Sequence, residues 1–302
     1  MTTVLTATTA PTTRTARGPS GLLWSVLRLH RTALVLLVLV TTAATAVLVW
    51  MYAIGDEARR GMSACAEPVA VDGLPTCASV EAITADDTYR TFIALIAAVL
   101  SYAIFPVAAW AGGALIGREL ESGTARLAWT QSVSPTRWLA AQLAVPALLL
   151  TAGTGAVALL NLWVRQDDPS LVGDWYYPDV FIATGPTVVA YPLAGLAVGA
   201  LAGLLCRRAL PAAGVGFAAA LLLHNVLERT RDDLSPTVTR VEEGGLELPR
   251  SAWQMRWEGE TRATFHPESH FWPLQYAETG ILLAVAAAAT LAAFAILRRR
   301  TP

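Results

Sequence analysis

The sequence predicts an all-α membrane protein with six transmembrane helices. Of its 302 residues, 54% are hydrophobic and only 15% are charged. Several uncharged apolar runs exceed about 18 residues, which is long enough for a helix to cross the roughly 30 Å hydrocarbon core of a bilayer. The chain is too long for one span with a tail, so these observations indicate a multi-pass protein.

Residues 1–18 are expected to form a disordered cytoplasmic tail, and residues 19–302 a single six-span domain. The tail is rich in Thr, Ala and Pro and has no apolar periodicity. The first apolar run begins only near Thr32, and no small-residue cleavage site follows at the usual distance. We therefore expect a retained first helix rather than a signal peptide.

The stretch GPSGLLWSVLRLHRTALV (18–35) precedes the first span and is amphipathic. Leu23, Trp24, Val26 and Leu27 can share one broad face, with Arg28 and Arg31 opposite or at its edge. This pattern predicts a short helix lying in the inner membrane surface. The alternative is a simple extension of the first span with arginine anchors.

Six hydrophobic runs follow, each bounded by charged or turn-forming residues. Four prolines, at positions 106, 146, 186 and 192, fall inside these runs, where neighbouring helices can satisfy the freed backbone groups. The predicted spans are Thr32–Ile54, Thr91–Ile116, Trp138–Val164, Val180–Leu205, Ala209–Leu227 and Ala277–Leu297.

The distribution of arginine predicts that both termini are cytoplasmic. An even number of spans places both termini on one side, together with residues 117–137 and 206–208. These segments hold 12 of the 22 arginines and only two of the 23 acids. Because cytoplasmic loops are enriched in basic residues, we expect a plasma-membrane protein with this side inside the cell.

Two long segments, 55–90 and 228–276, are then extracytoplasmic. Cys65 and Cys77 both lie in the first, where an oxidising exterior permits a disulfide contributing about 3 kcal/mol; two free thiols are the alternative. The second segment is too aromatic for a flexible linker. We expect a small folded cap, with short strands around SAWQMRWEGETRATF (251–265).

The segment GRELESGTARLAWTQSVSPTRW (117–138) carries more charge and aromatic residues than a plain connector needs. Ser122-Gly123 should break the helix that ends the second span. Thr124 can then cap a short helix through Gln131, and Ser134-Pro135 can begin the third span. The result is a helix–break–helix exposed to the cytoplasm, which either docks a partner or only anchors the bundle.

This segment resembles the cytoplasmic loop of type-2 ABC exporter permeases, in which an acidic residue precedes Gly-Thr after the second span. The run HPESHFWPLQYAETGILLAVAAAATLAAFAILRRR (266–300) is similar to the end of a six-span permease group common in actinobacteria. The resemblance covers nearly the whole chain. It implies an exporter membrane subunit that contacts a separate ATPase through this segment.

Carried onto this sequence, the resemblance makes Glu119, Glu121, Gly123 and Thr124 the candidate ATPase-coupling residues. Arg126 and Trp129 are added from their position in the same segment. The implied partners are an ABC ATPase, a second copy of the chain or a similar permease, and the lipid bilayer; no nucleic acid is expected.

Lysine is absent, since all 22 basic residues are arginine. A P-loop uses a lysine to reach the nucleotide phosphates, so this chain cannot contain one. We expect no enzymatic activity and no cofactor in this chain, with ATP and Mg²⁺ bound by the partner subunit. The alternative function is a membrane sensor or scaffold with a ligand-binding outer loop and no transported substrate.

Two further groups of residues are candidates for packing or for a pathway. Gly195, Gly199 and Gly203 form a small-xxx-small pattern that suits close helix packing, either within the chain or between subunits. His224 and Asn225, near the outer end of the fifth span, either line a pathway or cap the span.

His266 and His270 lie in the order HPESH, which does not fit the HExxH zinc motif. Pro267 disfavours the helix that such a motif needs, and the sequence offers no third ligand. No metal site is expected.

Overall fold

The computed structural model of the chain describes residues 21, 27–28, 31–64, 80–131, 133–165, 174–242 and 246–300. The predicted tail, the Cys65–Cys77 disulfide and most of the predicted interfacial helix lie outside these residues. The remaining cysteine, Cys206, has a free, half-buried thiol.

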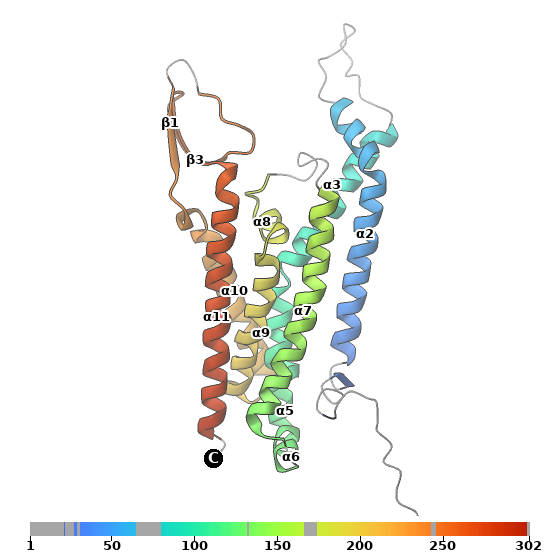
Figure 1. Ribbon diagram of the computed structural model, residues 1–302, viewed down its shortest axis with the longest axis vertical. Helices are drawn as coiled ribbons and strands as arrows, with labels where there is room; N and C mark the ends of the chain where they lie inside the picture. Colours follow the sequence, from blue (N-terminus) through green and yellow to red (C-terminus); the bar gives the residue numbers. More distant parts are fainter. Residues whose placement is uncertain are drawn as a thin grey trace, which may run out of the picture.

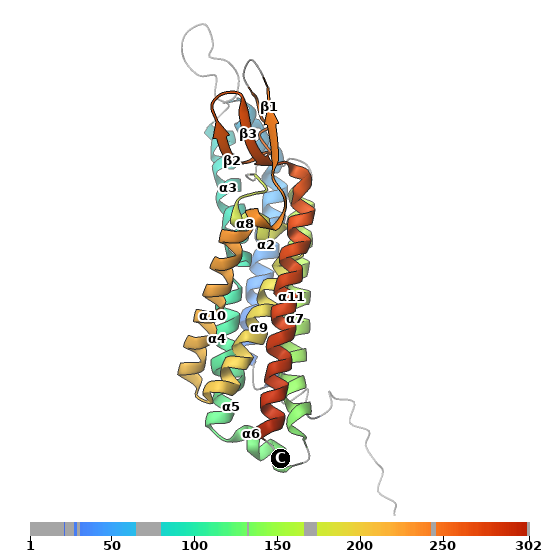
Figure 2. The same ribbon diagram turned by 90° about the vertical axis from the view of Figure 1, so that its left-hand side faces the viewer.

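The described residues form six helices long and apolar enough to cross a membrane, which confirms the predicted six-span architecture (Figure 1). The start of α2, the end of α11 and the short helices α5 and α6 lie together at one end of the bundle, named here the C-terminal end (Figures 1 and 2). A small sheet lies at the opposite end, named here the sheet end. The first span is α2 (Arg31–Ala64). The second is made of four consecutive elements: α3 (Val80–Ser101), α4 (Ile104–Trp110), the π-helix η1 (Ala111–Gly117) and α5 (Arg118–Glu121). The others are α7 (Pro135–Arg165), α9 (Thr187–Cys206), α10 (Ala209–Thr230) and α11 (Phe271–Arg300).

The fourth predicted span, Val180–Leu205, contains two helices that are separated at Gly185 and Pro186. Helix α8 (Pro178–Thr184) ends at Gly185, and α9 starts after Pro186, which has no N–H to donate. Gln275 of α11 lies against this break, where its amide Nε2 donates to the Phe181 carbonyl at 2.5 Å. The hydroxyl of Thr187 donates to Gln275 Oε1 at 2.9 Å. The break is therefore satisfied by a side chain that lies far away in the sequence.

Helix α9 is the centre of the bundle, and α2 lies at its edge. In α9, 72% of the most apolar window is buried within the chain, against 6% for α2. A continuously apolar helix in the middle of a bundle has no polar face, whereas the exposed leucines and valines of α2 suit a lipid-facing position.

Gly195, Gly199 and Gly203 pack against the second span of the same chain. A Cβ added at Gly195 would lie 2.6 Å from the Ile104 carbonyl oxygen, and one at Gly203 would lie 2.6 Å from the Ile116 side chain. Gly199 approaches the backbone of α4 in the same way. Of the two alternatives, the pattern serves packing within the chain.

The second span changes to a π-helix where it passes α9 and α10. Its sequence AGGALIG brings Gly112 so close to α10 that a Cβ would lie 2.5 Å from the Ala212 carbonyl oxygen. Single-turn π segments inside α-helices are frequent at functional sites. This one connects the packed core directly to α5 at the C-terminal end.

The residues between α10 and α11 include a three-stranded antiparallel sheet in the order β1-β3-β2. Strands β2 (Trp253–Glu258) and β3 (Arg262–His266) occupy the stretch predicted to contain strands, and β1 (Val238–Val241) pairs with β3. The indole of Trp175, before α8, donates to the Ser251 carbonyl at 2.7 Å. This bond attaches the segment just before β2 to the bundle.

Candidate functional site

A helix–break–helix at the C-terminal end forms the first candidate site. Helix α5 ends at Glu121, and Gly123 has φ 78°, a left-handed conformation that glycine adopts without steric cost. Helix α6 (Thr124–Thr130) then runs toward Pro135, the first residue of α7. The predicted break at Ser122-Gly123 is confirmed.

Glu119 and Thr124 hold the two short helices together. The Glu119 side chain is buried, and its carboxylate oxygen Oε2 accepts from the Thr124 hydroxyl at 2.7 Å. The same hydroxyl lies 3.2 Å from the Glu119 main-chain oxygen. The expectation that Thr124 caps α6 is wrong, because Gly123 is the N-cap and Thr124 instead binds back to the preceding helix.

Glu121 ties this segment to the fifth span. Its carboxylate oxygen Oε2 accepts from the Ala209 main-chain N–H at 2.8 Å, at the first residue of α10. A helix N-terminus has unpaired N–H groups and a partial positive charge, so a carboxylate stabilises it. The two acids thus act within the chain, Glu119 within α5–α6 and Glu121 between α5 and α10.

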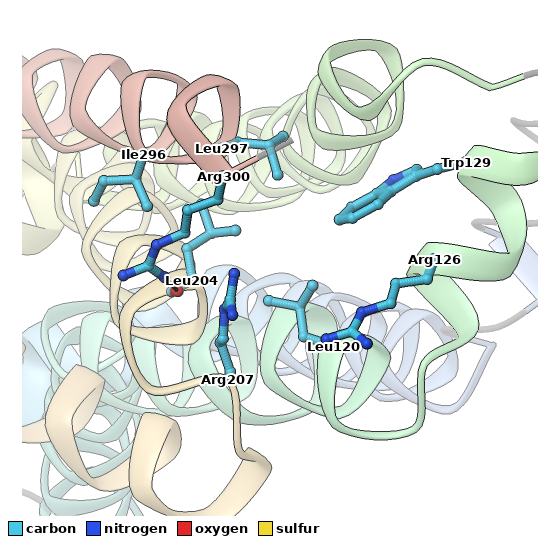
Figure 3. A pocket seen from close by; sticks show the side chains of 8 residues that line it. All are labelled: Leu120, Arg126, Trp129, Leu204, Arg207, Ile296, Leu297 and Arg300. Carbon is cyan, nitrogen blue, oxygen red and sulfur yellow. Dashed lines mark hydrogen bonds between the residues drawn. The ribbon is translucent and has the colours of Figure 1, made fainter. Parts of the chain in front are cut away.

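Arg126 and Trp129 of α6 line a cavity of about 220 Å³ at the C-terminal end (Figure 3). The Trp129 ring packs edge-on against Trp138, with centroids 5.6 Å apart. Arg207 and Arg300 line the same cavity from the turn after α9 and from the end of α11. Sequence reasoning did not bring these four residues together, because they come from segments far apart in the chain.

A buried charged cluster near the sheet end was also missed. Glu278 of α11 is fully buried, and its carboxylate accepts two hydrogen bonds from Arg231. Arg231 Nε lies 2.7 Å from Glu278 Oε2, and Arg231 Nη2 lies 3.1 Å from Glu278 Oε1. The Tyr191 hydroxyl donates to Glu278 Oε1 at 2.5 Å. The sequence feature that could have indicated this cluster is the lone acid Glu278 inside the apolar run QYAETGILLAV, because ionisable residues within spans usually face a protein partner.

His224 and Asn225 point in different directions. His224 is buried beside Tyr191 and Phe105, with ring centroids 5.4 and 5.2 Å away, and its Nδ1 is 3.6 Å from Glu228 Oε2. Asn225 is exposed and donates to the Leu221 carbonyl of its own helix at 2.8 Å. The structure therefore does not bring the two predicted pathway residues to one surface.

His266 and His270 contact each other, with 3.0 Å between their Nδ1 atoms. His266 Nε2 is 3.1 Å from the Asp232 carbonyl, which can only accept, so Nε2 carries the proton and His270 donates to His266 Nδ1. Burial lowers the pKa of His266. Among the described residues, no three potential ligands gather into a metal site.

A second cavity of about 550 Å³ lies between α2, the second span and α7. Its lining is almost entirely aliphatic and aromatic, including Leu37, Phe92 and Val145. Such a surface suits an apolar occupant, since it offers few polar groups to fix a polar ligand.

The family model described as ABC-2 membrane transporter related matches residues 34–231, from the first span through the fifth. This range contains the whole helix–break–helix and Arg207. No curated protein and no solved structure matches the chain significantly.

Proposed function

Because this chain belongs to the ABC-2 membrane transporter-related family, we propose that this ABC transporter membrane component is the permease of an ATP-driven exporter. A separate ATPase subunit binds and hydrolyses ATP with Mg²⁺. Two permeases, either two copies of this chain or this chain and a similar one, assemble around the translocation path.

The C-terminal end faces the cytoplasm in this proposal. The support is the charge distribution: arginines gather at the start of α7, at the α9–α10 turn and at the end of α11. The sheet end is then extracytoplasmic, and α5 and α6 face the compartment in which an ATPase would find nucleotide.

The helix–break–helix is the proposed docking element, supported chiefly by its attachment to the bundle. The Thr124–Glu119 bond holds α6 on α5, and the Glu121–Ala209 bond holds α5 on α10. A segment held in this way moves together with the bundle when a partner binds to it and displaces it. At its tip, Leu127 is 59% exposed, which offers an apolar contact to that partner.

This structure changes the roles proposed for the two acids. Glu119 is buried, so it positions α6 and does not itself contact the ATPase. Glu121 acts as the link to α10. Replacing either acid with Ala should leave membrane insertion intact and reduce ATPase stimulation.

Copurification tests the proposal. Leu127→Asn should weaken binding to the partner P-loop ATPase and reduce the stimulation of its ATP hydrolysis. Val241→Asn is the matched control, because Val241 is 65% exposed on β1 at the sheet end. Equal binding by both variants would remove α6 as the docking element. If no ATPase is retained by the unaltered chain, the membrane sensor or scaffold becomes the better assignment.

A further inference from the structure

We propose that the cavity lined by Arg126, Arg207 and Arg300 binds the phosphate headgroup of an anionic phospholipid. The cavity joins three elements: α6, the turn between α9 and α10, and the last turn of α11 (Figure 3). None of its lining residues is an acid. Its volume of about 220 Å³ is several times the roughly 30 Å³ that one water occupies, so a phosphodiester group fits.

The arginines have no charged partner within the described part of the chain. No described carboxylate forms a salt bridge with any of the three. Arg300 uses one of its hydrogen-bond donors within the chain, because its Nη1 donates to the Leu204 carbonyl at 2.8 Å near the end of α9. Three guanidinium groups gathered without an acid repel one another, and an anion between them removes that repulsion.

Arg207 is held in a conformation that favours glycine. With φ 56° and ψ 17°, it is the single non-glycine residue of positive φ among those described. Such a conformation costs an ordinary residue about 1–3 kcal/mol and is concentrated at functional sites. The Arg207 side chain extends into the cavity from this position (Figure 3).

The position of the cavity selects a lipid over a soluble anion. Leu120, Leu204, Ile296 and Leu297 form its apolar walls and belong to the ends of three membrane spans. Basic pockets between spans on the cytoplasmic side commonly hold anionic lipid headgroups. A phospholipid whose phosphate is bound here can place its acyl chains along the adjoining lipid-facing surface, where Leu205 is half exposed.

Native mass spectrometry of the purified full chain tests this site, with phosphatidylglycerol and phosphatidylcholine added in turn. The double variant R126Q/R207Q removes two guanidiniums that make no hydrogen bond to any described residue, so no internal bond is lost. Since a hydrogen bond to a charged group contributes at least about tenfold to binding, we expect at least roughly 100-fold weaker binding of phosphatidylglycerol. The control R137Q/R299Q removes the same charge at the same end from residues outside the cavity.

Three results would overturn the proposal. The first is an equal loss in R126Q/R207Q and R137Q/R299Q, which would indicate only a general charge effect. The second is displacement of the phospholipid by millimolar inorganic phosphate, which would indicate a free-anion site. The third is displacement by the ATPase subunit, which would assign the arginines to an acidic residue of that partner. Preferential, phosphate-resistant binding of phosphatidylglycerol that only R126Q/R207Q loses would support it.

Discussion

The buried pair Arg231–Glu278 allows a quantitative test of how the sheet end is held together. The two side chains are 2% and 0% exposed, and they make the two hydrogen bonds described above. Glu278→Met leaves the guanidinium buried without a counter-charge, and such a loss typically costs about 3–5 kcal/mol. For a chain of this length, that cost corresponds to a fall in the unfolding midpoint of roughly 5–8 °C.

A double-mutant cycle isolates the interaction. Arg231→Met should also destabilise the chain, because it leaves the Glu278 carboxylate with only the Tyr191 hydroxyl. The double variant R231M/E278M buries no charge, so we expect a coupling energy of roughly 2–3 kcal/mol. The measurement is thermal loss of the helical circular dichroism signal in detergent micelles. Single effects that add to the double effect within about 0.5 kcal/mol would show that the pair does not act as a unit.

Three further predictions follow from single contacts. Gly195→Val should destabilise the bundle by about 1–3 kcal/mol, because a backbone oxygen of α4 occupies the space of the new side chain. Gly214→Ala is the control, because nothing lies within 4 Å of an added Cβ, and it should not lower the stability measured in the same thermal unfolding experiment. Thr124→Val leaves the buried Glu119 carboxylate without its donor, at a cost of about 1–3 kcal/mol. This substitution should speed amide hydrogen exchange in α5 and α6 but not in the sheet. Exchange in α5 and α6 at the rate of the unaltered chain would refute the role of this hydrogen bond. For His266, burial lowers the pKa, so the unfolded state binds more protons and the sheet should lose stability as pH falls below about 6.5. Hydrogen exchange of β3 against pH checks this, and His266→Gln should flatten the profile.

The spans could be predicted from the sequence because each depends on a local property, the length of an apolar run. The break at Gly123 was equally local, since Ser-Gly is a common turn dipeptide and glycine adopts a positive φ without steric cost. Pro186 was recognised inside the fourth span, but a proline alone does not show whether the helix breaks there or which residue satisfies the break. Gln275, 90 positions away from Gly185, satisfies the freed backbone there.

The roles of the site residues were harder to predict than their positions. Glu119 and Glu121 were both expected on an exposed surface. Glu121 is exposed, but Glu119 is buried, and the carboxylates accept from the Ala209 N–H and the Thr124 hydroxyl, respectively. Sequence spacing gives the face of a helix, but it does not show which distant element covers that face. The convergence of arginines from α6, the α9–α10 turn and α11 was hidden for the same reason.

The contacts of α5 suggest how a push at the C-terminal end would spread through the bundle. Helix α5 continues into η1, whose glycines bring the second span so close to α9 and α10 that no side chain separates the backbones. Packed interiors deform little, so these elements should move together. Glu121 binds the start of α10, and Arg231, the C-cap residue directly after α10, binds Glu278 of α11. A displacement of α5 would therefore reach the sheet end through α10 by two charged contacts, one at each end of the same helix. On this argument Glu121→Ala should weaken the response of the sheet to ATPase binding while leaving the Arg231–Glu278 pair intact.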